Sequence, residues 1–534
     1  MMDRYAQDSK PATCIGIDFG TGSLVCGCAL QDGDYKTLSF PGWSQEIPDL
    51  NGSGPVHRIP VLVHYPDSGD HAIGDEVLRA GCRDHPATAR WIRNYLLKES
   101  TAQISTGTGR RITFRDAAAD LLGTVFARAV QECPDTGYVV FAIPDDAPSW
   151  YAVWLSSIAH TAGIESCHTI DECAAVPAGY GLTVEEGQSC ILVSIDENDL
   201  AISLVRNNGS RGLGVAGTSR EDTGCRALDG WIAQEIVAKS RVRYTGTRAQ
   251  KLYDAALASV GDVYYQLARG DEVSIDFTDP VTSLIISVRL TTDDITHCIA
   301  ECGLPFILDQ ALGHARAVAR TQGYPNDPPI AVLMTGRGSV IPAVQALVQQ
   351  QFPGIPVRCD HPFDAIARGA ATSSPRTPRA DRIKNHYALQ YWDPTEREHR
   401  YRFLVRSGAR YPSAGQVARI TISAAYDGQT RLGIPLYELR TAPEATAPDL
   451  ELVSDPAGGI RLAGPPEDTN GGSRPVLMNG RTPTLLTADP PALKGEPRFE
   501  LTFVLDRERR LCVTARDLMT GLLVKREAPV HQLT

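Results

Sequence analysis

The spacing of apolar residues predicts two hairpins of similar layout in the first part of the chain. Each combines an apolar strand, a short polar turn and a second apolar strand, one at 14–30 and one at 190–205. Continuous apolar runs at 138–143 and 330–334 are typical of strands buried on both faces of a sheet. Since one hairpin opens each half of this region, the pattern indicates an α/β unit with two duplicated lobes.

Helical spacing predicts the segments that cover these sheets. In the segment 115–133, Leu121 and Val125 fall on one helical face. Thr292, which precedes two aspartates, has the sequence of a helix N-cap. Four glycines within 209–217 predict a bend. Further helices are predicted at 149–162, 227–239, 250–267, 307–321 and 361–371, and a hairpin of alternating strands at 273–290.

The pattern changes to strands alone in the last part of the chain. A polar segment containing proline, 373–385, predicts an interdomain linker. Residues 498–505 alternate between apolar and polar, and 511–515 follows them across a tight polar turn. We therefore expect an all-β sandwich domain at 386–534.

Two further expectations concern the order of strands in this sandwich. Segments 419–426 and 431–439 flank Asp427 and Gly428, which predicts a hairpin with a two-residue turn. The segment 441–496 is rich in proline, glycine and asparagine, and we expect a long loop insertion there.

Composition narrows the class of protein. The net charge of −11 argues against a nucleic-acid-binding protein, because phosphate binding needs a basic surface. The 13 cysteines are scattered, which favours reduced, mostly buried thiols over a disulfide framework or a metal site. With neither an apolar leader nor an apolar run of about 18 residues, we expect no signal peptide, no membrane span and a cytoplasmic location.

The first hairpin turn has the residues of a phosphate-binding loop. Gly20, Thr21 and Gly22 offer backbone N–H groups to an anion, since glycine lets a phosphate approach closely. Asp18, at the end of the preceding strand, could hold a hydrated Mg²⁺ beside that phosphate. A plain β-hairpin is the alternative. The second turn, 196–199, has three acids and no glycine.

Together these landmarks resemble the DnaK-type heat-shock chaperones. The resemblance extends over nearly the whole chain, and its pieces come in the family's order. It rests on IGIDFGTGS (15–23), VVFAIP (139–144), IDECAAVPAGYGL (170–182), VLMTGRGSVIPAV (332–344), HPFDAIARGAA (361–371) and the C-terminal strands.

The resemblance implies a fold and a domain organisation. It implies an α/β, actin-like ATPase domain at 1–372, with ribonuclease-H-like lobes at 1–187 and 188–372. After the linker comes an all-β sandwich domain that binds peptide. No long amphipathic helix follows the sandwich, so we expect a relative that lacks the family's helical lid.

It also implies roles for individual residues. Asp18, Gly20, Thr21 and Gly22 match the first phosphate loop, and Asp18 and Asp196 are the metal-binding candidates. Glu172 matches the acid that positions water and Mg²⁺, and Arg93 falls where the family has its catalytic lysine. The remaining carry-overs are Asp196 as the leading acid of the second phosphate loop, Gly336, Gly338 and Ser339 in the adenosine loop, and Pro144 as the switch proline.

Several departures from the family pattern lie at the nucleotide site. Glu197 and Asp199 bring negative charge where glycines and a threonine are usual. Arg337 interrupts the paired glycines of the adenosine loop, and Val340 replaces an arginine that stacks on adenine. We therefore expect ATP or ADP with Mg²⁺ to bind at low affinity, if at all, and hydrolysis to be poor.

Three functions remain open on this basis. The first is a divergent chaperone-like protein that binds extended polypeptide through its sandwich. The second is an active, ATP-dependent, lidless chaperone. The third is a non-catalytic scaffold with one dedicated protein partner. None of them involves nucleic acid or a membrane.

Overall fold

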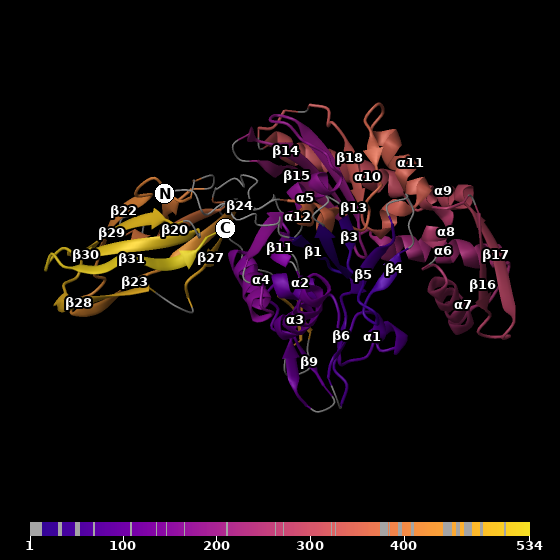
Figure 1. The fold of residues 1–534 in the computed structure, drawn as a ribbon, viewed down its shortest axis with the longest axis horizontal. Coiled ribbons are helices and arrows are strands. Elements are labelled where there is room, and N and C mark those ends of the chain that lie inside the picture. The colour runs from indigo at the N-terminus through magenta and orange to yellow at the C-terminus, as the bar shows by residue number, and fades with distance from the viewer. Residues whose placement is uncertain are drawn as a thin grey trace, which may run out of the picture. The chain divides into compact units, whose positions relative to one another are not determined.

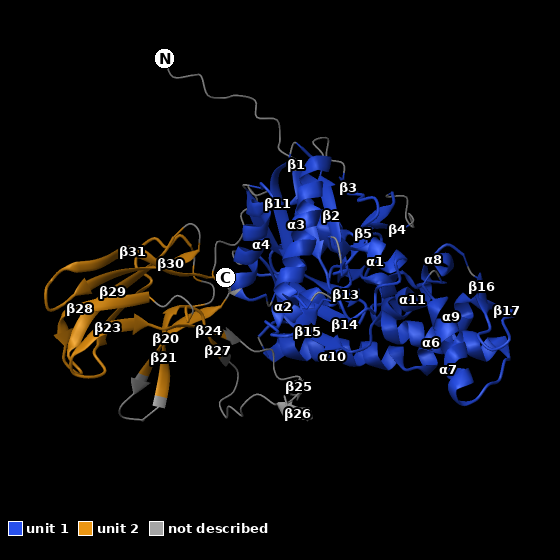
Figure 2. Ribbon diagram, turned by 90° about the horizontal axis from the view of Figure 1, so that it is seen from below, with its two compact units in different colours: residues 1–377 blue, residues 378–534 orange. Residues whose placement is uncertain are grey.

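The chain divides into two compact units, residues 1–377 and residues 378–534 (Figure 2). Unit 1 is mixed α/β, and unit 2 is built from strands (Figure 1). No helix in the described ranges combines the length and the apolar character needed to cross a membrane. The computed structural model describes residues 13–29, 35–47, 54–67, 70–106, 109–134, 136–145, 147–164, 166–209, 212–261, 263–270, 272–321, 323–325, 327–373, 383, 385–393, 398–406, 409, 411–441, 451–454, 460–463, 473–480, 484–506 and 509–533.

The first lobe of unit 1 is organised around a mixed sheet. Strands β1 (Thr13–Phe19) and β2 (Ser23–Ala29) form the first predicted hairpin, with Ile15 opposite Cys28. On one side, β1 pairs in parallel with β11 (Thr136–Ile143), which pairs in parallel with β12 (Cys167–Asp171). On the other side, β2 pairs with β3 (Tyr35–Thr37) and β5 (Val56–Pro60), and β5 pairs with β4 (Gln45–Ile47).

The second lobe repeats this arrangement. Strand β13 (Ser189–Ile195) pairs antiparallel with β14 (Leu200–Asn207), which confirms the second predicted hairpin. The sheet order β15-β14-β13-β18-β19 matches β3-β2-β1-β11-β12 in strand order and in strand direction. The added strands are β15 (Leu213–Glu221), β18 (Val332–Thr335) and β19 (Val357–Arg358).

Two short helices cross between the lobes at glycine contacts. Helix α5 (Glu172–Gly179) follows β12, and α12 (Ala365–Thr372) follows β19. A Cβ atom on Gly369 would lie 1.8 Å from the Ala175 carbonyl oxygen, and one on Gly179 would lie 1.9 Å from the Ala365 carbonyl oxygen. The two backbones therefore touch, and a side chain on either glycine would force them apart.

Each crossing helix packs on the sheet of the other lobe. Ala370 of α12 lies in a buried cluster with Cys14 and Val140 of the first sheet. A Cβ atom on Gly16 of β1 would lie 2.1 Å from the Ala367 carbonyl oxygen, so α12 rests directly on β1. Helix α5 contributes Val176 to a cluster built on the second sheet. The exchanged helices thus fix the position of one lobe relative to the other.

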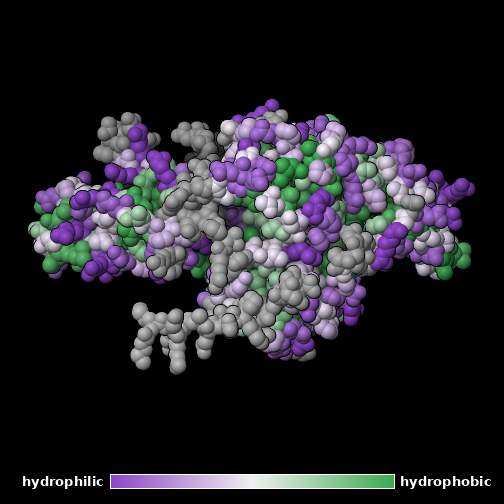
Figure 3. Space-filling view, turned by 45° about the horizontal axis from the view of Figure 1, so that its top comes forward, coloured by the Kyte–Doolittle hydropathy of each residue, from purple (hydrophilic) through white to green (hydrophobic). Residues whose placement is uncertain are grey.

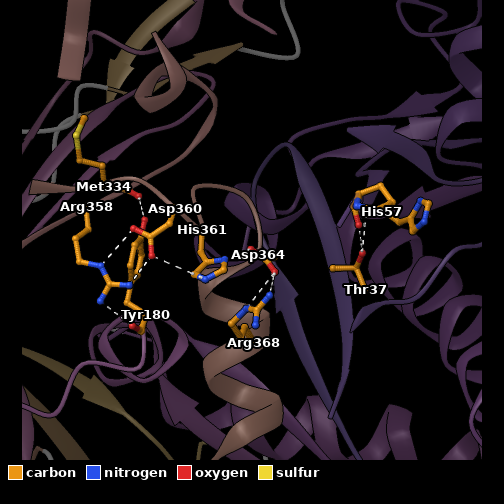
Figure 4. A network of polar contacts seen from close by, with 10 residues as sticks. Thr37, His57, Tyr180, Met334, Arg358, Asp360, His361, Asp364 and Arg368 are labelled. Carbon is orange, nitrogen blue, oxygen red and sulfur yellow. Dashed lines mark hydrogen bonds and ion pairs between the residues drawn. The ribbon is translucent and has the colours of Figure 1, made fainter. Parts of the chain in front are cut away.

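A polar network anchors the ends of these helices (Figure 4). The Tyr180 hydroxyl donates to the Met334 carbonyl at 2.5 Å, and Arg358 donates to the Tyr180 carbonyl at 2.8 Å. Asp364, at the start of α12, pairs with Arg368 at 3.4 Å and lies 3.5 Å from the His361 ring. The contacts join the end of α5 to β18, β19 and α12.

Some predicted boundaries in unit 1 were wrong for identifiable reasons. The glycines of 209–217 do not only form a bend, because β15 begins at Leu213 and contains Gly214 and Gly217. A Cβ on Gly217 would lie 2.1 Å from the Ala315 carbonyl of α10, so this glycine serves helix packing. The N-cap of α9 is Thr291, one residue earlier than predicted, in a capping box with Asp294. The single helix predicted at 250–267 is two helices, which are interrupted near Gly261.

The other elements of unit 1 cover the two sheets. Their bounds are α1 (Asp75–Arg79), α2 (Ile92–Leu97), α3 (Phe114–Glu132), α4 (Ser149–Thr161), α6 (Cys225–Ser240), α7 (Gly246–Ala258), α8 (Val263–Leu267), α9 (Thr292–Glu301), α10 (Leu304–Thr321), α11 (Pro342–Gln351), the 3₁₀ helix η2 (Arg337–Val340), β6 (Val63–His64), β7 (Ala72–Ile73), β8 (Thr88–Ala89), β9 (Gln103–Ser105), β10 (Arg111–Thr113), β16 (Glu272–Thr278) and β17 (Ile285–Thr291).

Unit 2 encloses a core between two four-stranded sheets. Their orders are β21-β20-β24-β27 and β22-β29-β30-β31. Tyr387 and Leu436 from the first sheet share a buried cluster with Phe499 and Phe503 from the second. The strands are β20 (His386–Asp393), β21 (Glu398–Val405), β22 (Ala418–Ser423), β23 (Gln429–Ile434), β24 (Leu436–Thr441), β25 (Glu451–Ser454), β26 (Ile460–Ala463), β27 (Ser473–Leu477), β28 (Thr484–Ala492), β29 (Pro497–Leu505), β30 (Arg510–Asp517) and β31 (Leu523–Gln532).

The pairing of 498–505 with 511–515 is confirmed, but the hairpin predicted at 419–439 was wrong. Strand β22 pairs with β29, whereas β23 pairs with β28. The turn at Gly428 therefore leads the chain away from β22, and its N–H donates to the Ala492 carbonyl at 2.9 Å. Alternation identified the strands, but it does not encode their partners.

The loop predicted at 441–496 was also wrong in part, because β27 and β28 lie within it and pair with β24 and β23. Residues 442–450, 455–459, 464–472 and 481–483 of that segment lie outside the described residues. So do most of the predicted linker and the first 12 residues of the chain.

We predict that Gly369→Ala lowers the stability of unit 1, because the new methyl group meets the backbone of α5. The expected loss is about 3 kcal/mol in the free energy of unfolding, at the upper end of the usual overpacking cost. Gly123→Ala in α3 is the matched control, since no atom lies within 4 Å of its Cβ position. This variant should be neutral or more stable by up to about 1 kcal/mol. Denaturant unfolding of both variants measures the difference, and equal midpoints would contradict a tight α5–α12 contact.

Candidate functional site

Residues far apart in the sequence meet where the two hairpins turn. Asp18 is the penultimate residue of β1, and its buried Oδ1 atom has no hydrogen-bond partner among the residues that the structure describes. Burial, together with the negative charges of Glu172 and Asp196, raises the pKa of Asp18 to about 7 against the opposing charge of Arg93. Asp18 is therefore a buried carboxyl group poised between its charged and neutral forms near neutral pH.

Arg93 and Glu172 form an ion pair beside this carboxyl group. Arg93 lies on α2, whose apolar residues Ile92 and Leu96 are buried, and its guanidinium donates to Glu172 Oε1. Glu172 is the first residue of α5, where the positive end of the helix dipole favours an acid. The structure thus brings both residues to Asp18, and it also engages them with each other.

Hydrogen bonds within the first turn and to two neighbouring segments hold this turn in place. The Gly20 N–H donates to the Ser23 carbonyl at 2.9 Å, and the Gly22 carbonyl accepts from the Val61 N–H at 3.1 Å. The Thr21 hydroxyl donates to Asn94 Oδ1 at 3.1 Å. Gly20 is required here, since a Cβ atom would lie 2.8 Å from the Ser23 carbonyl oxygen.

The second turn has the same outline with acidic side chains. The Asp196 N–H donates to the Asp199 carbonyl at 3.0 Å, and the Ser194 hydroxyl donates to Asp196 Oδ2 at 2.7 Å. Burial raises the pKa of Asp196, while the Ser194 hydrogen bond lowers it. A Cβ atom on Gly224 would lie 2.4 Å from the Asp199 nitrogen, so this glycine lets the next segment close over the turn.

The two turns face each other through Glu197. A Cβ atom on Gly22 of the first turn would lie 3.8 Å from Glu197 Cβ of the second. Glu197 Oε1 lies 3.7 Å from the Arg83 guanidinium, and Oε2 lies 3.7 Å from that of Arg337. The Glu197 side chain therefore begins beside the glycine turn, and its carboxylate lies near arginines from both lobes.

Arg337 belongs to a closed cluster in the second lobe. Its guanidinium donates to Asp229 at 2.6 Å and lies 4.7 Å from the centroid of the Tyr264 ring. The Tyr264 hydroxyl donates to the other oxygen of Asp229. Arg337 is only 15% exposed, so the protein itself satisfies this cation.

The glycines and the serine of the third loop have local roles. Gly336 has a φ of 86°, and a Cβ atom there would lie 2.4 Å from the Ile195 carbonyl oxygen. A Cβ atom on Gly338 would lie 2.4 Å from the Ile195 side chain. The buried Ser339 hydroxyl donates to the Thr335 carbonyl at 2.5 Å. These residues therefore hold the loop against β13.

Sequence reasoning did not find Arg83, Asp229 or Tyr264. Arg83 lies between α1 and β8, Asp229 is on α6, and Tyr264 is on α8, so no local spacing connects them. The structure brings Asp18, Arg93, Glu172 and Asp196 close enough for their charges to act on one another. In the described part of the chain, no group of three or more His, Cys, Asp or Glu side chains forms a metal-ligand set.

We predict that Asp18→Asn changes the pH dependence of stability. The native protein holds the Asp18 proton more tightly than the unfolded chain does, because the pKa rises from 3.8 to about 7 on folding. Wild-type stability should therefore be complete at low pH and fall as pH rises through this range, by at most about 4 kcal/mol. Asp18→Asn removes this loss, so it should exceed the wild type in stability at pH 8 and equal it near pH 4.

Denaturant midpoints measured from pH 4 to pH 8 provide the test. Asp254→Asn, on the exposed face of α7, controls for the loss of one negative charge. A difference between Asp18→Asn and the wild type that stays constant with pH would show that Asp18 is not a strained buried acid.

Comparison with known proteins gives similarity along almost the whole chain. No protein-family model matches. Curated relatives do match, and all three described here carry the name chaperone protein DnaK. The protein of Thermosipho africanus is 23% identical over 545 residues, which cover 96% of this chain and 79% of the relative. The protein of Thermosipho melanesiensis is 23% identical over 547 residues, and that of Thermotoga neapolitana is 24% identical over 549, with the same coverage.

The order of elements supports this similarity. The paired hairpins, the crossing helices and the all-β second unit occur in the order that the resemblance implies. At 23–24% identity the relationship is distant. The chain is thus similar along nearly its whole length to DnaK chaperones, which is consistent with a divergent relative of that family.

Proposed function

We propose that this protein is a chaperone-like protein that binds extended polypeptide. We also propose that the two lobes of its actin-like domain stay closed on each other when no nucleotide is bound. Support for the first part comes from relatives named as chaperones and from the all-β unit. Support for an actin-like domain comes from the two sheets of matching order and the exchanged helices. The observation that carries the second part is the position of Glu197 against Gly22.

The phosphate side of the site fits a nucleotide poorly. The unpartnered Asp18 oxygen would suit a hydrated cation. The space next to Gly22, however, holds the Glu197 side chain. A carboxylate and a phosphate about 4 Å apart repel by about 4 kcal/mol at an intermediate dielectric constant. We therefore assign no hydrolytic step to Glu172, Asp196 or Arg93.

The opposite side of the site is filled as well. Arg337, Asp229 and Tyr264 satisfy one another, and Val340 is buried in the core of the second lobe. A purine would have to displace a paired, largely buried guanidinium, which costs more than removing an exposed one. Glu197 stands between the arginines of the two lobes in the way that an anionic ligand would.

Unit 2 exposes apolar side chains at one end of a sheet. The end of β22, the start of β29, the end of β30 and the start of β31 lie side by side by strand register. Figure 3 shows apolar, green side chains at the left end of unit 2. The exposed apolar residues on the turns and strands at this sheet end are Tyr426, Leu493, Leu518, Met519, Leu522, Leu523 and Val524.

The most apolar of these turns, 517–523, is rigidly supported. Arg498 and Asp517 form a buried ion pair beneath it at 2.7 Å. Asp517 Oδ1 also accepts the Met519 N–H at 2.9 Å, and the Gly521 N–H donates to the Asp517 carbonyl at 2.8 Å. A preformed apolar surface loses little entropy on binding, which suits an extended apolar polypeptide.

We predict that Glu197→Gly gives the protein a response to nucleotide. The wild type should show almost no change in thermal midpoint with 5 mM ATP and Mg²⁺, and the variant should be stabilised, because a ligand that binds only the native state raises stability. The measurement is a thermal melt with and without ATP and Mg²⁺, with AMP as a negative ligand.

Asp222→Gly is the matched control, since it removes an exposed acid from a turn of the same lobe. A clear stabilisation of the wild type by ATP and Mg²⁺ would overturn nucleotide-independent closure and would favour the active ATPase. A Glu197→Gly variant whose thermal midpoint does not change with ATP and Mg²⁺ would show that Glu197 does not block the site.

We predict that Leu522→Ser weakens the binding of extended apolar peptides about tenfold. Loss of one buried leucine contact corresponds to about 1.5 kcal/mol. Leu522 is 65% exposed in the free protein, so the change should leave folding intact. Fluorescence anisotropy with a panel of apolar peptides measures the affinity, and Leu284→Ser, at an exposed site of unit 1, is the control.

The panel also separates the alternatives. Binding of several unrelated apolar peptides supports a chaperone-like function. If no peptide in the panel binds, the dedicated scaffold becomes the better reading.

A further inference from the structure

Two cysteines that are distant in the sequence have their sulfur atoms in contact. Cys28 lies on β2, the second strand of the hairpin that carries the first glycine turn. Cys133 caps the C-terminus of α3. Their Sγ atoms are 3.3 Å apart in a thiol–thiol hydrogen bond, although 105 residues separate them along the chain. Disulfide formation brings two sulfurs to about 2.05 Å, so a closure of about 1.3 Å would join this pair.

The two thiols have different surroundings. Cys28 is fully buried, whereas Cys133 is 7% exposed at a helix end. The hydrogen bond with Cys28 and the charge of Lys36, the register partner of Cys28, both favour ionisation of Cys133, and burial opposes it. These effects lower the pKa of Cys133 to about 7. Because the thiolate is the nucleophile, Cys133 is the reactive member of the pair.

We propose that Cys28 and Cys133 form a reversible redox site that closes to a disulfide when the protein meets a peroxide. The inference is independent of the proposed function of the nucleotide site. It assigns a chemical modification to residues that the polypeptide-binding surface and the two turns do not use.

The reaction has two balanced steps. The Cys133 thiolate attacks one oxygen of hydrogen peroxide, the O–O bond breaks, and sulfenic acid and hydroxide form. The Cys28 thiol, as thiolate, then attacks the Cys133 sulfur, and the sulfenic oxygen leaves as water after taking up a proton. In total, two thiols and one peroxide give one disulfide and two waters. A thiol reductant reverses the change by exchange.

The bond would tie the glycine-turn hairpin to the end of α3. In strand β2, Cys28 is three residues from Val25, which pairs directly with Asp18. A cross-link over a loop of this length restricts the unfolded chain strongly, so oxidation should raise the thermal midpoint of unit 1. The redox state of the pair would thereby affect the rigidity of the strand that holds Asp18.

The experiment treats the full chain with hydrogen peroxide and follows the thiols. We expect the count of maleimide-reactive thiols in denaturant to fall from 13 by two, and tryptic mass spectrometry to find Cys28 joined to Cys133. Dithiothreitol should restore both thiols. The thermal midpoint should rise on oxidation and return on reduction.

Two variants make the result specific. Cys133→Ala should lose both the cross-link and the midpoint rise, whereas Cys190→Ala, at a fully buried thiol of the second lobe, should keep both. Three outcomes would overturn the proposal. They are a cross-link between other cysteines, oxidation of Cys133 to sulfinic acid without a cross-link, and no loss of thiols at peroxide concentrations that oxidise a free thiol.

Discussion

The backbone contact between α5 and α12 is the constraint on which unit 1 depends. Gly179 and Gly369 let the two helices touch, and Gly16 lets α12 rest on β1. A helix from each lobe thus packs on the sheet of the other, and the lobes cannot rotate without separating these contacts. Because β1 and β13 are fixed in this way, the turns that follow them are also fixed opposite each other. The site is a consequence of this helix exchange.

Within that frame, the charges of the two turns decide what the site can hold. Asp18 is buried with one unpartnered oxygen, and its neighbours Glu172 and Asp196 disfavour its charge. Arg93 compensates on one side, while Arg83 and Arg337 accompany Glu197 on the other. Replacing glycine with carboxylate in the second turn keeps the hairpin and changes its electrostatics. The fold that holds the two turns and the chemistry of their side chains can therefore vary separately.

Unit 2 uses buried charge for a different purpose. The Arg498–Asp517 pair lies under an exposed apolar turn and fixes its backbone through the second carboxylate oxygen. Burying one partner alone would be costly, so each of the two residues stabilises the other in its buried position. Leu518, Met519 and Leu522 of this turn are exposed.

The sequence by itself determined the two hairpins, the buried strands and the division into an α/β and an all-β unit. These features depend on local periodicity and on turn residues, both of which can be read within about 20 positions. It also singled out Asp18 from its place at a strand end before a glycine turn, and Arg93, Glu172 and Asp196 through resemblance to family motifs. Strand partners in unit 2 were not encoded locally, and the hairpin expected at 419–439 was wrong for that reason. Only the tertiary structure brought Arg83, Asp229 and Tyr264 to the site and Cys133 to Cys28, because contacts between distant segments follow from packing geometry and not from spacing along the chain.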